Sequence, residues 1–176
     1  AMRILLTNDD GITSRGLLAA KQALDTVGEV SVIAPDSNRS AVGRGITIDR
    51  SLTVTEVELR DGSRGFATDG TPVDCVRFAE LGFLGERPDL IVAGINYGVN
   101  LGDDVTYSGT VAAAFEGIVL GIPAIAVSQQ SKEAGLHFRR QRNYDFSPAA
   151  VARKVLIAAW HVLARQERFK PSRVAA

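Results

Sequence analysis

The chain has 176 residues, which is enough for one domain with a sizeable core. Twenty basic and twenty acidic residues leave no net charge, which argues against recruitment by polymeric nucleic acid or by an anionic membrane. Cys75 is the only cysteine, so an internal disulfide is excluded and a reducing, cytoplasmic location is expected. We expect no signal peptide near Met2 and no membrane-spanning segment, because no apolar run is long enough.

The first part of the chain alternates between apolar runs and an amphipathic segment. Residues 4–7 and 30–34 predict strands, and residues 16–27 between them carry leucine and alanine at helical spacing. These three segments predict a βαβ unit. Apolar and polar residues then alternate between residues 46 and 68, around the turn at Asp61-Gly62. This pattern predicts a hairpin that leaves the parallel sheet.

The next part repeats the alternation. Gly70-Thr71-Pro72 begins a predicted helix that runs to about Leu84, with proline at its favoured first turn. Residues 90–93 and 124–127 predict two more strands, and residues 111–120 predict the helix between them. At least four parallel strands are therefore expected.

A last amphipathic helix is expected over residues 146–163, with Ser147 as its cap and Pro148 in its first turn. The whole pattern predicts one α/β domain over residues 1–176. Its expected architecture is a Rossmann-like, mostly parallel sheet with flanking helices and a β-hairpin excursion.

Two adjacent carboxylates, Asp9 and Asp10, directly follow the first predicted strand. Ligands of open α/β sheets bind beyond the carboxyl ends of the strands, and Gly11 allows a turn that brings both side chains to one site. Close carboxylates repel each other, and a hard cation relieves that repulsion. The alternative is an Asx-type turn that closes the strand without a metal. The residues alone leave both interpretations open.

Polar loops also follow the later strands at the same edge of the sheet. Ser40 follows the strand at residues 30–34, and Asn96 follows the strand at residues 90–93. Together with the two aspartates they supply only oxygen donors, which favours Mg²⁺, Mn²⁺ or Ca²⁺ over zinc or copper. A hydroxyl bonded to the backbone is the alternative for Ser40, and turn stabilisation is the alternative for Asn96.

Ser108, Gly109 and Thr110 stand at the start of a predicted helix. A helix N-terminus attracts anions, and a glycine there lets a phosphate approach the backbone amides. A plain N-cap is the alternative role of Ser108. We expect replacement of Gly109 by valine to obstruct phosphate while sparing the metal ligands. A hard-cation site beside an anion site indicates a metal-assisted phosphoester hydrolase.

Four motifs in this order resemble the SurE survival-protein family of nucleotidases, over about residues 2–130. The motifs are Thr7-Asn8-Asp9-Asp10-Gly11, Ala34-Pro35-Asp36-Ser37-Asn38-Arg39-Ser40, Gly70-Thr71-Pro72-Val73-Asp74-Cys75, and Gly94-Ile95-Asn96 continuing through Asn100-Leu101-Gly102-Asp103-Asp104 to Tyr107-Ser108-Gly109-Thr110. The resemblance implies a Rossmann-like fold that hydrolyses nucleoside monophosphates with one divalent metal ion, Mg²⁺ or Mn²⁺. Short polyphosphate is a further substrate to consider.

The resemblance also implies roles for residues at the matching motif positions. The implied metal ligands are Asp9, Asp10, Ser40 and Asn96, and the implied catalytic set is Asp9, Asp10 and Asn96. The residues implied to surround the substrate phosphate are Asn100, Ser108, Gly109 and Thr110. Members of the family form homodimers or homotetramers and continue well beyond this length, so we expect the C-terminal part of the family's domain to be incomplete here.

Two other function classes stay open at this point. A receiver-like phosphoacceptor module also has an acidic pair after its first strand, and residues 88–92 resemble the run before its acceptor aspartate. Here that acceptor position is occupied by Gly94. The other alternative is a nucleotide-binding module without catalysis. For an enzyme, attack by water and a covalent aspartyl-phosphate are both possible routes.

Overall fold

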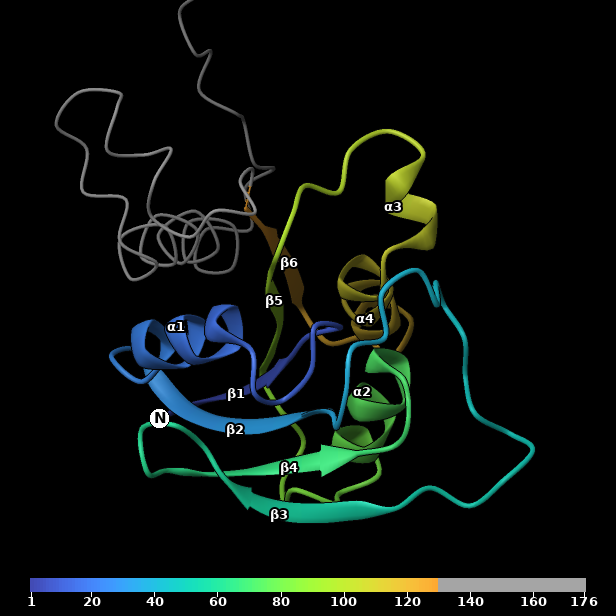
Figure 1. Cartoon of the computed structure of the whole chain (residues 1–176). Coiled ribbons are helices and arrows are strands. Elements are labelled where there is room, and N and C mark those ends of the chain that lie inside the picture. The colour runs from blue at the N-terminus through green and yellow to red at the C-terminus, as the bar shows by residue number, and fades with distance from the viewer. Residues whose placement is uncertain (130–176) are drawn as a thin grey trace, which may run out of the picture.

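The structure is a computed structural model that describes residues 1–129, so the helix predicted over residues 146–163 lies outside the described residues. Within these residues six strands and four helices follow one another along the chain (Figure 1). In chain order they are β1 (Met2–Thr7), α1 (Arg15–Leu24), β2 (Gly28–Pro35), β3 (Val54–Glu58), β4 (Arg64–Thr68), α2 (Pro72–Glu80), β5 (Leu90–Asn96), α3 (Asp104–Tyr107), α4 (Gly109–Val119) and β6 (Ala124–Ser128).

One six-stranded sheet in the order β3-β4-β2-β1-β5-β6 organises these elements. The four predicted parallel strands are confirmed as β1, β2, β5 and β6. The predicted hairpin is present as β3 and β4, but it extends the sheet instead of leaving it, because β4 pairs in parallel with β2, placing Phe66 opposite Ile33. This pairing gives partners to the backbone groups along the free edge of β2.

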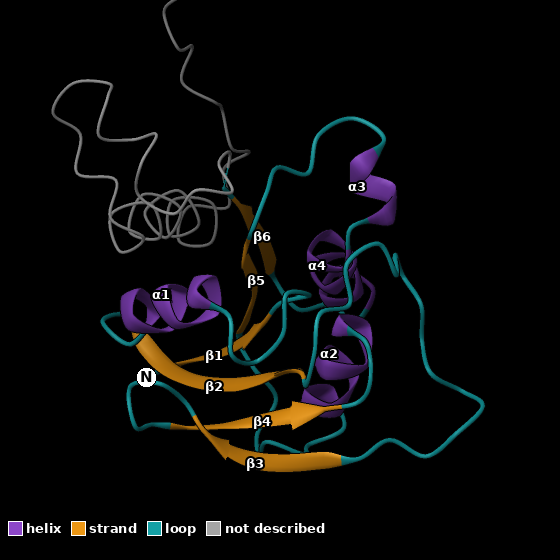
Figure 2. Ribbon diagram, in the orientation of Figure 1, coloured by secondary structure: helices purple, strands orange, loops and turns teal. Residues whose placement is uncertain are grey.

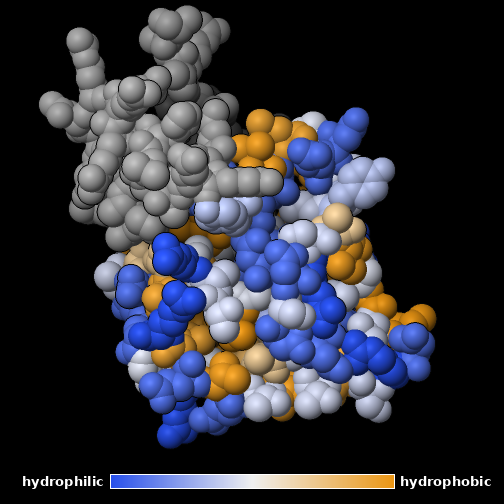
Figure 3. Space-filling view, viewed as in Figure 1, coloured by the Kyte–Doolittle hydropathy of each residue, from blue (hydrophilic) through white to orange (hydrophobic). Residues whose placement is uncertain are grey.

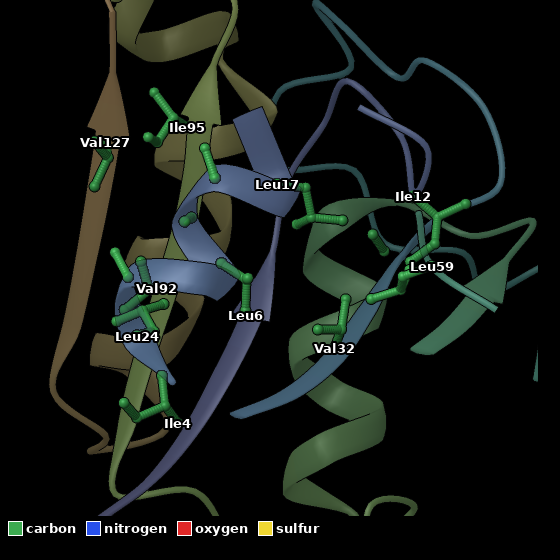
Figure 4. Close-up of a cluster of buried hydrophobic side chains, with 14 of the residues drawn as sticks. Ile4, Leu6, Ile12, Leu17, Leu24, Val32, Leu59, Val92, Ile95 and Val127 are labelled. Atoms are coloured by element: carbon green, nitrogen blue, oxygen red, sulfur yellow. The ribbon is translucent and has the colours of Figure 1, made fainter. Parts of the chain in front are cut away.

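Helices cover both faces of the sheet, with α1 on one face and α2 and α4 on the other (Figure 2). Side chains alternate along β1, so that Ile4 and Leu6 join the cluster under α1 while Leu5 packs with residues of α2 and α4. Figure 4 shows the first cluster, in which Leu17 and Leu24 of α1 lie over the strands. Burial on both faces explains why the central strands are continuous apolar runs.

The helix boundaries follow local signals in the sequence. Ser14 caps α1, its Oγ accepting from the backbone N–H of Leu17 at 3.2 Å. Pro72 occupies the first turn of α2, as predicted, and Thr71 forms a capping box with Asp74. Both helices end earlier than predicted, and α2 is followed by Gly82 at a φ of +85°. This left-handed conformation stops a helix and is tolerated by glycine.

The surface seen in Figure 3 is largely hydrophilic, with apolar residues scattered across it. Within residues 1–129, no helix combines the length and apolar character needed to cross a bilayer.

Candidate active site

A tight turn after β1 carries Asp9 and Asp10, and the buried side chain of Asn8 closes it. Oδ1 of Asn8 accepts from the backbone N–H of Gly11 at 3.2 Å, and its Nδ2 donates to the carbonyl of Gly11 at 3.1 Å and to Oγ of Ser14 at 2.7 Å. The Asx-type turn considered above is therefore made by Asn8. The turn is thus closed without the carboxylates of Asp9 and Asp10. Sequence reasoning missed this role of Asn8.

Asp9 is held against the start of α4. Asp9 is only 3% exposed, and both of its carboxylate oxygens accept hydrogen bonds from Thr110. The hydroxyl of Thr110 donates to Oδ1 at 2.6 Å, and its backbone N–H donates to Oδ2 at 3.1 Å. The backbone N–H of Arg39 donates to the carbonyl of Asp9 at 2.7 Å. Two segments from distant parts of the chain thus fix this residue.

Asp10 is half-buried and has one neutral donor, the backbone N–H of Tyr97, at 2.8 Å from its Oδ2. Burial raises the pKa of Asp10, the Tyr97 N–H opposes that rise, and the neighbouring Asp9 adds to it. Within residues 1–129, no basic side chain forms a salt bridge with either aspartate. The two carboxylates are therefore close together without a protein counter-ion.

Asn96 ends β5 beside this pair. The pairing of β5 with β6 shifts register between Ala93 and Asn96, and such an irregularity redirects a side chain at the end of a strand. Nδ2 of Asn96 donates to the carbonyl of Gly98 at 2.9 Å, which is the turn-stabilising role considered above. Because the amide nitrogen makes this bond, the amide oxygen is left to accept or to ligate.

Ser40 lies on the loop at residues 36–53, which follows β2, and it is exposed. Its backbone N–H donates to Oδ1 of Asn38 at 2.7 Å, whereas its hydroxyl makes no hydrogen bond within the part of the chain that the structure describes. The neighbouring Arg39 binds the backbone of Asp9, so the structure brings this loop to the aspartates. The role of Ser40 as a ligand stays a prediction.

The residues expected to bind phosphate are already engaged in several internal hydrogen bonds. Oγ of Ser108 accepts from the backbone N–H of Val111 at 3.1 Å, which is the capping alternative. Thr110 is committed to Asp9, and Nδ2 of Asn100 donates to Oγ of Ser128 at 2.6 Å. Gly109 is the first residue of α4, and its backbone N–H has no hydrogen-bond acceptor among the described residues.

Gly109 allows α4 to approach Asp9. A Cβ at this position would lie 2.8 Å from Cβ of Asp9 and 3.1 Å from both Oδ2 of Asp9 and Cγ of Pro72. Any side chain would therefore displace the carboxylate. The expectation that a valine at this position would leave Asp9 untouched is wrong, because Gly109 packs directly against Asp9.

The donor set fits a hard divalent cation. Residues 1–129 contain no cluster of three or more histidine, cysteine, aspartate or glutamate side chains, so a metal here would be held by two carboxylates and neutral oxygens. Within the described residues neither carboxylate has a counter-ion, and burial already disfavours the charge on Asp10. Mg²⁺ and Mn²⁺ prefer oxygen ligands of this kind and usually retain several waters.

Comparison with known proteins places this chain in a family. The sequence matches the family model of survival protein SurE over residues 4–172. A protein from Rubrobacter xylanophilus named 5'-nucleotidase SurE is 62% identical over 128 residues, which are 72% of this chain and 48% of that protein. Another 5'-nucleotidase SurE, from Chloroflexus aggregans, is 50% identical over 156 residues, covering 89% of this chain and 59% of that protein.

A solved structure has the same fold. The crystal structure of the SurE protein from Aquifex aeolicus gives a TM-score of 0.74 at 39% sequence identity, covering 92% of this chain and 60% of that one. The chain thus spans about half the length of the curated relatives it matches. The family match over most of the sequence, together with these identities, shows that the chain belongs to the SurE family.

Proposed function

We propose that this protein is a divalent-metal-dependent phosphatase that hydrolyses nucleoside monophosphates to nucleoside and phosphate, as a 5'/3'-nucleotidase. The observation that carries the proposal is the pair of hydrogen bonds from Thr110 to Asp9, which joins the carboxylate pair to the N-terminus of α4. A cation site and an anion site thereby adjoin. Relatives named 5'-nucleotidase SurE support this reading over a phosphoacceptor module.

One Mg²⁺ or Mn²⁺ is the proposed cofactor, held by Asp9, Asp10, Ser40 and Asn96. When bound, such an ion polarises a phosphoryl oxygen and lowers the pKa of a coordinated water towards neutrality. The support for this assignment is the oxygen-only donor set around two carboxylates that have no salt-bridge partner among residues 1–129.

The two aspartates are suited to different tasks. Both oxygens of Asp9 accept from Thr110, so Asp9 is a fixed ligand. Asp10 has only its Oδ2 engaged within residues 1–129, which leaves Oδ1 to orient the attacking water and accept its proton. In this proposal the backbone N–H of Gly109 and the positive end of the α4 dipole stabilise the negative charge on the phosphate.

Phosphate release tests this function. The chain should release phosphate from nucleoside monophosphates when Mg²⁺ or Mn²⁺ is present, should stop with chelator and should recover when metal is returned. A screen across bases, sugar positions and short polyphosphate would define the substrate. Release that persists after exhaustive chelation would contradict the metal mechanism, and tight nucleotide binding without release would favour a binding module.

We further propose that the protein works as at least a homodimer in the cytoplasm. Helix α4 exposes the apolar side chains of Phe115, Ile118 and Val119 at helical spacing, which supports a self-association surface. The single thiol, Cys75, is buried, which supports a reducing compartment. Light scattering at micromolar concentration tests the assembly, and a fully active monomer would contradict it.

A further inference from the structure

Glu116 of α4 is a buried carboxylate that the proposed chemistry does not use. It is 1% exposed and forms salt bridges with two arginines from different parts of the chain. Nη2 of Arg77, on α2, lies 2.6 Å from its Oε1, and Nη2 of Arg44 lies 3.1 Å from its Oε2. A buried carboxylate needs such partners. The Arg44 contact is also a hydrogen bond, whereas Oε1 of Glu116 accepts no hydrogen bond within the described residues, so Arg44 is the better-anchored of the two arginines.

Arg44 belongs to the loop at residues 36–53, which also carries Ser40. Two neighbouring contacts hold the same part of the loop: the backbone N–H of Gly43 donates to the carbonyl of Tyr107 at 3.0 Å, and Thr71 Oγ1 donates to the carbonyl of Gly45 at 2.7 Å. Arg39 binds the backbone of Asp9 on the other side of Ser40. Ser40 therefore lies between an attachment to the aspartates and an attachment to α3, α2 and α4.

The backbone between these attachments needs external support. Ala41 has a φ of +62°, in the left-handed region that a residue with a Cβ rarely adopts, and Gly43 has the same value. Such conformations persist where the surroundings enforce them. The salt bridge of Arg44 to a buried carboxylate, next to the Gly43 hydrogen bond, is the charged contact that can enforce them.

We infer that Glu116 is a positioning residue, which acts through Arg44 to hold the loop that carries Ser40 at the metal site. This inference rests on the proposed function, because it assigns a task to the loop of a proposed ligand. Arg77 contacts the same carboxylate from α2 and, within residues 1–129, forms no hydrogen bond or salt bridge with the loop, so it serves the packing of α2 against α4.

The experiment compares Arg44→Ala with Arg77→Ala in the full chain. Each variant removes one guanidinium from Glu116 and one positive charge from the protein, so the two are matched. Removal of a positive charge by itself favours cation binding. A loss of Mn²⁺ affinity therefore cannot be attributed to the change in charge. The readouts are hydrogen exchange of the Gly43 amide, Mn²⁺ affinity by calorimetry, and the melting temperature.

Arg44→Ala should speed exchange at Gly43 by about tenfold or more, because the loop opens locally. It should weaken Mn²⁺ binding about tenfold, which is typical when a group that orients a ligand is lost. Arg77→Ala should lower the melting temperature and leave both other readouts near wild type. Arg44→Lys, which keeps the charge at Glu116, should recover most of the Gly43 protection.

Equal effects of the two alanine variants would overturn the inference, and so would unchanged Gly43 exchange or unchanged Mn²⁺ affinity in Arg44→Ala. If the wild-type chain binds no Mn²⁺, the proposed metal site fails. The exchange measurement then still decides whether Glu116 holds the loop, so the two failures are distinguishable.

Discussion

Acidic residues stand in opposite settings at the two ends of β1. At the carboxyl end, Asp9 and Asp10 receive hydrogen bonds from neutral donors on Thr110 and Tyr97. At the amino end, Arg3 binds Asp89 as a fork: its Nε lies 3.1 Å from Oδ2 and its Nη2 lies 2.8 Å from Oδ1. At the amino end the protein itself neutralises the acidic residue, whereas at the carboxyl end the described residues supply no counter-ion.

The pKa shifts at the two ends have opposite directions for this reason. Burial raises the pKa of Asp10, and the adjacent Asp9 raises it further. The hydrogen bonds of Arg3 lower the pKa of Asp89 to about 2. A carboxylate with a resident cation contributes to stability, whereas a crowded pair without one favours binding of an external cation. Each prediction below tests this contrast.

Asp10→Asn should have the largest effect on function. We expect Mn²⁺ affinity and phosphate release to fall by at least about a hundredfold, beyond the 10- to 100-fold loss typical of residues that only orient a ligand. The melting temperature of the metal-free chain should not fall, because the substitution removes a partly buried charge and its repulsion from Asp9. Calorimetry with Mn²⁺ and thermal denaturation measure the two effects.

Asp89→Asn is the control from the other end of the sheet. It removes one charge partner of Arg3, so it should lower stability near neutral pH and leave Mn²⁺ affinity unchanged. Normal metal binding by Asp10→Asn would remove that residue from the site. A loss of metal affinity in Asp89→Asn would show that the two ends are coupled.

Gly109→Ala should reduce both stability and metal affinity, because the new Cβ would lie 2.8 Å from Cβ of Asp9. Overpacking of this kind typically costs about 1–3 kcal/mol of unfolding free energy. We expect Mn²⁺ binding to weaken about tenfold as Asp9 is displaced. Urea unfolding and calorimetry on the same preparation test the prediction.

Gly117→Ala is the matched control on the same helix. Its Cβ would lie 2.8 Å from both Cβ of Ala124 and Cδ1 of Ile91, on the sheet-facing side and away from the aspartates. It should therefore cost similar stability and leave Mn²⁺ affinity near wild type. Loss of metal affinity in both variants would indicate a general response of α4 to overpacking.

Much of the fold could be predicted because its signals are local. Apolar runs of strand length marked four of the five mutually parallel strands, and Pro72 marked the start of α2. The pairing of β4 with β2 could not be predicted, because it depends on contacts between residues far apart in the chain. The four-residue α3 was missed as well, since one helical turn leaves no periodic pattern.

The candidate site divides in the same way. It could be predicted that one edge of the sheet carries Asp9, Asp10 and Asn96, because these polar residues follow the ends of predicted strands. Their partners were not predictable: Thr110 is 101 residues from Asp9 and reaches it only through the packing of α4 against β5 and β6. The assignment of metal and phosphate ligands stays a prediction that the variants above can test.

The pH dependence of stability offers a finer test of the amino end. The pKa of Asp89 is lowered in the folded state, so its salt bridge stabilises the protein above the unfolded pKa of about 3.9, and this contribution is lost as the pH falls towards about 2. The difference in unfolding free energy between wild type and Asp89→Asn should therefore be constant above pH 5 and shrink at lower pH. Urea unfolding across this range measures it, and a constant difference at every pH would contradict the assignment.

We expect the smallest effect in thiol labelling of Cys75. This measurement tests the burial of a core side chain and not a charged group. The thiol lies in α2 inside the core, and burial raises its pKa to about 12. At pH 8 it should be protonated and inaccessible, so a thiol reagent should label it only when the chain opens. Mn²⁺ should slow the labelling further, because an ion that binds the native state alone stabilises it. The same ion should have less effect on labelling of Asp10→Asn, which lacks one proposed ligand.

Labelling can be followed by mass spectrometry, with the unfolded chain as the reference for full reaction. Rapid labelling of the native protein would show that the core beneath the site opens readily, and an identical Mn²⁺ effect in both proteins would place the ion somewhere other than the carboxyl end of β1.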